Sequence, residues 1–174
     1  MNIYLAGPDV FFPNAVAIGE AKKQICARYG HQGHNPFDNE IYFSPTPDCG
    51  YEICRLNLET IARCDAVVAN LTPFRGVSAD PGTVFEVGYA VALGKRVYGY
   101  SCDPRSYNQR VAADPNVAGL APDVDRWGDY VENFALADNL MIEGGIRQTD
   151  GLFIARAGEN LAVFEELISL LPDT

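Results

Sequence analysis

A buried strand followed by an apolar helix constrains the fold of this chain most strongly. Residues 65–71 form a nearly continuous apolar run, typical of a strand in a parallel sheet that is covered on both faces. Residues 80–95 predict a helix, because Asp80 is a suitable N-cap, Pro81 suits the first helical position and Gly94 is a suitable end. A strand that leads into such a helix indicates an α/β fold.

The same alternation continues along the chain. Apolar runs predict further strands at 2–6, 33–36, 96–100 and 152–155, and apolar residues at helical spacing predict helices at 15–29, 51–64, 127–141 and 158–171. We expect 37–50 and 101–125 to be irregular, because they are rich in Pro, Asp and other turn-forming residues. About five parallel strands with helices on both faces predict a flavodoxin-like, doubly wound sheet.

Length and charge exclude several classes of protein. The chain has 174 residues, which suits a single domain spanning 1–174, and its net charge of −10 would be repelled by nucleic acid or an anionic membrane. It has no apolar run long enough to cross a bilayer and no basic leader before the first strand. Its five cysteines lack zinc-site spacing. We therefore expect a cytoplasmic protein with reduced thiols and no metal site.

The apolar helix contains a carboxylate that needs an explanation. Between Asp80 and Lys95 the only ionisable side chains are Glu86 and Tyr89. A helix this apolar should be buried on most sides, and a carboxylate within it either lines a pocket or is costly to bury. Gly82 shares a helical face with Glu86, close to free N–H groups that can hold a polar substrate group. Glu86 could also simply reach solvent at the edge of the helix.

The predicted sheet places several loops at one edge. Ligands of doubly wound sheets bind beyond the carboxyl ends of the strands, where the segments 4–9, 37–40 and 72–86 should converge. The candidate substrate contacts in the first loop are Gly7, Asp9 and Phe11.

Five sequence blocks stand out. They are Ile-Tyr-Leu-Ala-Gly-Pro at 3–8, Pro-Phe-Asp-Asn-Glu at 36–40, Cys-Asp-Ala-Val-Val-Ala at 64–69, Asp-Pro-Gly-Thr-Val-Phe-Glu-Val-Gly-Tyr-Ala at 80–90, and Asp-Asn-Leu-Met at 138–141. In this order they resemble the nucleoside 2-deoxyribosyltransferases over most of the chain. The block with Asp80 and Glu86 is the specific one, whereas Gly7-Pro8 alone would be weak.

This resemblance implies a retaining glycosyl transfer. The residue matching Glu86 attacks C1′ of a 2′-deoxynucleoside, the base leaves, and a deoxyribosyl ester forms on the carboxylate. A second base then attacks C1′ and regenerates a β-nucleoside. The implied partners are 2′-deoxynucleosides and nucleobases, and the chemistry needs no metal or redox cofactor.

The resemblance also implies roles for individual residues. Tyr4 matches a tyrosine that holds the nucleophile by a hydrogen bond, although it could be an ordinary core residue. Asp80 matches a carboxylate that contacts the base and can shuttle its proton, in addition to capping the helix. Glu40 lies where some members have a base-reading Gln. Asn57 lies where some members have an Asp, and an Asn cannot protonate a leaving base as an Asp can.

The last block implies an assembly. Asn139 matches an asparagine that a neighbouring subunit supplies to the 5′-hydroxyl of the sugar, and Met141 beside it closes over the sugar or simply packs in a core. The resemblance therefore implies a homo-oligomer, a dimer or a multiple of dimers, with active sites shared between subunits.

Two other functions fit these residues. A 2′-deoxynucleoside 5′-phosphate N-hydrolase would use the same nucleophile with water as acceptor, and Arg75 could bind its phosphate. The block at 139–141 instead favours a free 5′-hydroxyl. A nucleotide-binding module without turnover is the third possibility, but a phosphate would favour a cation at the position of Glu86.

Overall fold

The computed structural model describes residues 1–39 and 43–172. Five strands form one parallel sheet in the order β2-β1-β3-β4-β5. The strands are β1 (Asn2–Ala6), β2 (Gln32–His34), β3 (Ala66–Asn70), β4 (Arg96–Ser101) and β5 (Phe153–Ala155). This order is that of the flavodoxin-like sheets, so the predicted fold is confirmed.

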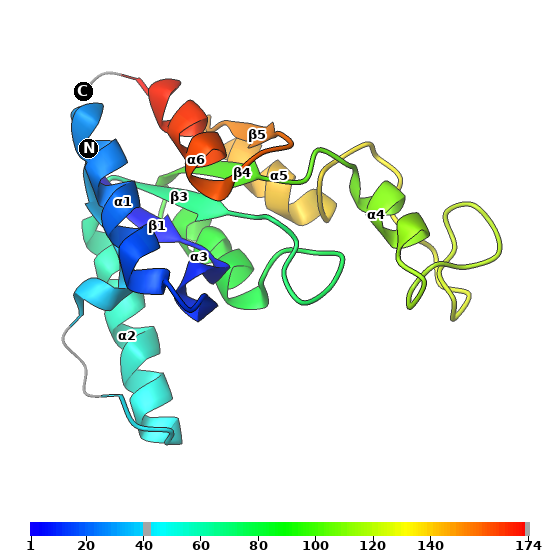
Figure 1. Cartoon of the computed structure of the whole chain (residues 1–174), viewed down its shortest axis with the longest axis horizontal. Coiled ribbons are helices and arrows are strands. Elements are labelled where there is room, and N and C mark those ends of the chain that lie inside the picture. Colours follow the sequence, from blue (N-terminus) through cyan, green and yellow to red (C-terminus); the bar gives the residue numbers. More distant parts are fainter. Residues whose placement is uncertain (40–42, 173–174) are drawn as a thin grey trace.

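Helices cover both faces of the sheet (Figure 1). The α-helices are α1 (Ala15–Arg28), α2 (Pro47–Arg63), α3 (Pro81–Ala92), α4 (Tyr107–Ala113), α5 (Leu140–Gln148) and α6 (Asn160–Ser169), and the short 3-10 helices are η1 (Pro8–Phe11) and η2 (Pro36–Asp38). Helices α1 and α6 pack on one face, and α2, α3 and α5 pack on the other.

The central strands serve both layers of the core. Side chains alternate along a strand, so Ile3 and Leu5 of β1 point toward α1 and α6, whereas Tyr4 and Ala6 point toward α2 and α3. Every residue of β3 is buried, which is why its sequence is apolar throughout apart from its last residue, Asn70. The alternation therefore directs the Tyr4 hydroxyl to the face that α3 covers.

One edge of the sheet gathers the loops of interest. Strand β1 pairs in parallel with β3, with Ala6 opposite Ala69, so both strands end at the same edge. The chain turns to β2 on one side of β1 and to β3 on the other, which makes this edge the topological switch point of the sheet. Helix α3 starts there, after the loop at 71–80.

The prediction of a helix at 127–141 is wrong. Residues 127–139 are irregular, and α5 begins only at Leu140. Gly128 and Ala135 have φ angles of 90° and 58°, which no right-handed helix accommodates. Two of the apolar side chains whose spacing suggested a helix are exposed, Tyr130 at 94% and Phe134 at 63%.

Residues 102–138 form an excursion from the sheet that we call the arm. It leaves after β4, extends away from the sheet and returns before α5 (Figure 1). Its helix α4 lies in a segment that was expected to be irregular, where Ser106 and Gln109 form a capping box. Helix α2 also starts earlier than predicted, because Thr46 caps it and Pro47 occupies its first position.

Helix α3 is less buried than its composition predicted. Its inner side is buried at Thr83, Val87 and Ala90, whereas Phe85 is 59% exposed and Leu93, just after its end, is 43% exposed. The apolar outer side of α3 therefore lies on the surface of the single chain. No helix in the described part of the chain is long and apolar enough to cross a membrane.

Candidate active site

Glu86 meets Tyr4 at the centre of the candidate site. The Tyr4 hydroxyl donates a 2.7 Å hydrogen bond to Oε1 of Glu86, and it joins residues that lie 82 positions apart in the sequence. Tyr4 is fully buried in β1, so it holds the carboxylate from beneath. Burial and the nearby Glu86 charge keep the pKa of Tyr4 far above its usual value, and the phenol therefore remains a donor.

The surroundings of Glu86 disfavour its negative charge. Burial raises the pKa of Glu86 from 4.5 to about 7, the hydrogen bond from Tyr4 opposes this rise, and the charge of Asp80 adds to it. A carboxyl group with a pKa near neutrality beside a second carboxylate is characteristic of catalytic sites.

Asp80 links the start of α3 to the candidate site. Its side chain accepts hydrogen bonds from Thr83 N at 2.9 Å and from Thr83 Oγ1 at 3.0 Å, which makes it the N-cap of the helix. Gly82 is exposed in the first turn, and a Cβ atom there would lie 3.1 Å from Oδ2 of Asp80. Glycine thus leaves space beside the Asp80 carboxylate.

The loop after β1 is anchored by a buried ion pair. Oδ2 of Asp9 lies 2.5 Å from Nζ of Lys22, and Asn70 and Asn160 donate further hydrogen bonds to the same carboxylate. Asp9, which was predicted to contact the substrate, is only 7% exposed, and its carboxylate is bound within an internal network. Gly7 allows the close approach of this loop to β3, since a Cβ atom there would lie 2.8 Å from Cβ of Asn70.

Phe11 lies at the rim of the same loop. It is 52% exposed and stacks on Phe74, with 5.4 Å between ring centroids and an interplanar angle of 15°. The guanidinium of Arg75 lies 4.9 Å from the Phe11 ring centroid and 4.7 Å from that of Phe74. An exposed aromatic ring held in this way can stack on a nucleobase.

The side toward α2 contributes Asn57. This half-buried residue accepts a 3.4 Å hydrogen bond from Nδ2 of Asn39. Asn39 immediately precedes a residue that was predicted to contact the base. That residue, Glu40, lies outside the described residues.

Asn139 and Met141 lie at the start of α5. Asn139 is the N-cap of α5, where its Oδ1 accepts from Met141 N at 3.0 Å and its Nδ2 donates to Glu132 Oε1 at 2.7 Å. The other oxygen of Glu132 accepts from Leu140 N at 2.9 Å. Met141 is 74% exposed.

Apart from Asp9, Asn57 and Glu40, the predicted residues form two groups. Tyr4, Asp80, Gly82 and Glu86 come together at the switch point, and Gly7 and Phe11 belong to the adjacent loop. Asn139 and Met141 instead border an apolar groove of about 660 Å³ between α3 and α5, which is lined by Val84, Val87 and Val91 of α3. Within the described residues, no group of three His, Cys, Asp or Glu side chains is placed to hold a metal ion.

Several residues around the site had no signal in the sequence. Glu132 and Arg110 lie in segments without a resemblance block, and their partners become apparent only in the folded chain. Asp138 stands inside the block at 138–141, but the sequence does not indicate that its carboxylate is buried.

The raised pKa of Glu86 predicts that replacing its charge with a neutral group stabilises the fold at high pH but not at low pH. The folded state binds a proton at Glu86 more tightly than the unfolded state, so ionised Glu86 destabilises the fold increasingly from pH 4.5 to about 7. We expect Glu86→Gln to raise the free energy of unfolding at pH 8 by up to about 3 kcal/mol, and to change it little at pH 4. Denaturant unfolding at both pH values measures this difference. Glu20→Gln, at an exposed position of α1, is the control, and an equal effect of both variants at pH 8 would refute the assignment.

This chain is similar to known proteins in sequence and in structure. A family model described as nucleoside 2-deoxyribosyltransferase matches residues 3–141. The structure of a 2-desoxiribosyltransferase from Leishmania mexicana is 30% identical and has a TM-score of 0.72, covering 98% of this chain and 99% of its own. A 2-deoxyribosyltransferase from Bacillus psychrosaccharolyticus is 21% identical, with a TM-score of 0.52 over 79% of this chain and 96% of its own, which is a likeness of fold.

A curated relative extends the similarity. An uncharacterized protein of Schizosaccharomyces pombe is 34% identical in an alignment that covers 88% of this chain and 80% of that protein. With the family match over most of the chain, these similarities show that the chain belongs to the nucleoside 2-deoxyribosyltransferase family, whose members act on N-glycosidic bonds.

Proposed function

We propose that this protein is a nucleoside 2-deoxyribosyltransferase that moves 2-deoxyribose between nucleobases through an ester on Glu86. The observation that carries the proposal is the Glu86 carboxylate, which Tyr4 holds in a largely buried setting at the switch point of the sheet. Membership of the family, and 30% identity to the Leishmania mexicana enzyme over nearly the whole chain, support it.

The first half of the reaction forms the ester. Ionised Glu86 attacks C1′ of the deoxynucleoside, the N-glycosidic bond breaks, and the base leaves with the bonding electron pair. Tyr4 holds Oε1, and within the described residues Oε2 makes no hydrogen bond, so Oε2 is the oxygen that attacks. The leaving base takes a proton from water, either directly or through an Asp80 carboxyl group that has first taken one up from solvent, because the amide of Asn57 is too weak an acid to supply it.

The second half reverses these steps with a new base. A ring nitrogen of the acceptor base attacks C1′, the ester bond breaks, and its electrons return to the Glu86 carboxylate. The acceptor loses its N–H proton to Asp80 or to water. Two inversions at C1′ give net retention, and Glu86 is regenerated.

The ionisation of Glu86 gives this mechanism a pH dependence. Only the carboxylate attacks, and the pKa of Glu86 lies at about 7, so the rate of ester formation should rise with pH up to this value. Because the charge of Asp80 contributes to the raised pKa, Asp80→Asn should move this rise to lower pH.

A second copy of the chain completes the site in this proposal. Apolar side chains are exposed on the outer side of α3, at the start of α5 and along the arm; the largest are Phe85, Leu93, Leu120, Trp127, Tyr130, Phe134 and Met141. Such a collection is rare on a soluble monomer and typical of an interface. A two-fold interface there would bring Asn139 and Met141 of one protomer to the site of its partner.

Glu132 favours a free 5′-hydroxyl over a 5′-phosphate on the substrate. The free N–H groups at a helix start attract anions, but at α5 the Glu132 carboxylate already binds Leu140 N and the Asn139 amide. A phosphate beside Asn139 would be repelled by this charge. The transferase is therefore favoured over the 5′-phosphate hydrolase.

The first test of the function is a transfer assay. Incubation with deoxyinosine and adenine should yield deoxyadenosine and hypoxanthine, measured by chromatography. Glu86→Gln should lower the rate by about 1,000-fold or more while retaining the fold, because a neutral amide does not attack C1′. A 2-fluoro-arabinosyl nucleoside should leave its sugar on Glu86, as detected by mass spectrometry. Hypoxanthine without deoxyadenosine would identify a hydrolase, and wild-type rates in Glu86→Gln would exclude the mechanism.

The second test concerns the 5′ position. We expect the wild-type protein to prefer deoxyinosine over its 5′-monophosphate, and Glu132→Gln to reduce the ratio of the two kcat/KM values by about tenfold, since one repulsive charge is removed. Asp129→Asn, at an exposed position of the arm, is the matched control. An unchanged ratio in Glu132→Gln would mean that this carboxylate only caps α5.

The third test concerns the shared site. Glu86→Gln chains still supply Asn139, and Asn139→Ala chains still supply Glu86, so mixing the two inactive variants should restore roughly a quarter of wild-type activity in randomly paired dimers. Pull-down of differently tagged chains must first establish that subunits exchange, and thermal unfolding must establish that Asn139→Ala is folded without its N-cap. Exchange without recovery of activity would mean that Asn139 serves its own chain or no site.

A further inference from the structure

A buried ion pair lies where the arm joins the rest of the molecule. Nη2 of Arg110 in α4 lies 3.3 Å from Oδ2 of Asp138, and both side chains are only 3% exposed. Removing two charges from water is costly, and such pairs are retained where further hydrogen bonds satisfy both groups. The partners of these two side chains therefore indicate what the pair does.

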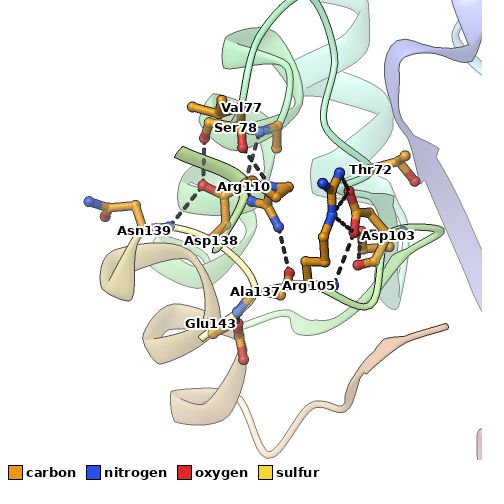
Figure 2. Close-up of polar contacts among 12 residues, drawn as sticks. Thr72, Val77, Ser78, Asp103, Arg105, Arg110, Ala137, Asp138, Asn139 and Glu143 are labelled. Carbon is orange, nitrogen blue, oxygen red and sulfur yellow. Dashed lines mark hydrogen bonds and ion pairs between the residues drawn. The ribbon is translucent and has the colours of Figure 1, made fainter. Parts of the chain in front are cut away.

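The Asp138 carboxylate has four donors from three parts of the chain (Figure 2). Oδ1 accepts from Ser78 Oγ at 2.5 Å and from Asn139 N at 2.8 Å. Oδ2 accepts from Ala79 N at 2.9 Å and from Arg110. The carboxylate thereby ties the segment just before α3 to the segment just before α5.

Arg110 holds the preceding residue of the same segment, Val77. Its Nε donates to the carbonyl oxygen of Val77 at 2.7 Å, and its Nη1 donates to that of Arg105 at 2.9 Å. Three consecutive residues, 77 to 79, are thus fixed by the pair, and Figure 2 shows these contacts converging from α4 and the end of the arm. The next residue in the chain is Asp80.

We propose that Arg110 and Asp138 are positioning residues that set the Asp80 side chain to relay a proton from solvent to the leaving base. The inference rests on the proposed function. Asp80 is the N-cap of α3, so the backbone at 77–79 runs directly into it, and a shift of that backbone would move Asp80 relative to Glu86 further along the same helix. Displacing a catalytic group by about 1 Å can lower the rate about a hundredfold. The ion pair can therefore change the rate of proton transfer although neither side chain touches the substrate.

The test compares two leaving groups. Hypoxanthine needs a proton as it leaves deoxyinosine, whereas p-nitrophenolate leaves p-nitrophenyl 2-deoxyriboside without one. Asp138→Asn keeps the shape of the side chain but replaces one acceptor oxygen by a donor. We expect it to lower kcat about tenfold or more with deoxyinosine and less than about threefold with the phenyl glycoside, as Asp80→Asn should. A loss of folded protein would lower both rates equally.

Two further variants keep the inference falsifiable. Ser78→Ala leaves the ion pair intact and should lower kcat with deoxyinosine more than with the phenyl glycoside, by a smaller factor than Asp138→Asn. It therefore tests the positioning role if Asp138→Asn does not fold. Arg105→Gln breaks only the exposed pair with Asp103 and should match wild type on both substrates. Equal losses on the two substrates, or no loss, in the folded Asp138→Asn and Ser78→Ala proteins would overturn the inference.

The two proposals fail in different ways. A wild-type protein that cleaves neither substrate would refute the proposed function. Equal losses on both substrates in Asp80→Asn would refute the positioning role, since there would be no proton transfer to position, but would leave the chemistry of Glu86 standing.

Discussion

The hydrogen bond from Tyr4 to Glu86 is the interaction around which this structure is arranged. It requires a strand side chain on the face that α3 covers, a helix that begins at the carboxyl edge of the sheet, and a carboxylate on the inner side of that helix. Each condition follows from a feature of the doubly wound sheet. The alternation along β1 directs Tyr4, and the crossover after β3 places α3 above it.

The environment of Glu86 is a compromise between stability and reactivity. Burial among apolar side chains disfavours the charged form, and one hydrogen bond from a phenol compensates only in part. A fully solvated carboxylate would stabilise the fold better and would be shielded by water from a sugar carbon. Destabilised groups of this kind are common at catalytic sites, where stability is lost in exchange for activity.

The sequence predicted the sheet well because its signals are local. The apolar run at 65–71 and the capping residues of α3 depend on neighbours in the chain, and both are confirmed. The helix at 127–141 failed because apolar spacing does not report the left-handed backbone at Gly128 and Ala135. The contact of Tyr4 with Glu86 came from the family resemblance. The ion pair of Arg110 with Asp138 was not predictable, since it depends on where the arm returns.

The closed base of the arm separates its tip from the rest of the molecule. Arg110 binds Asp138, and Tyr107 N donates to the carbonyl oxygen of Leu136 at 2.8 Å. These contacts join the outgoing and returning segments of the arm before it extends outward. A change of length or sequence beyond this junction is not transmitted to the segment before α3. An engineered replacement of the tip should therefore leave the segment before α3 in place, provided that it keeps the junction, Glu132 and the exposed apolar side chains of the arm.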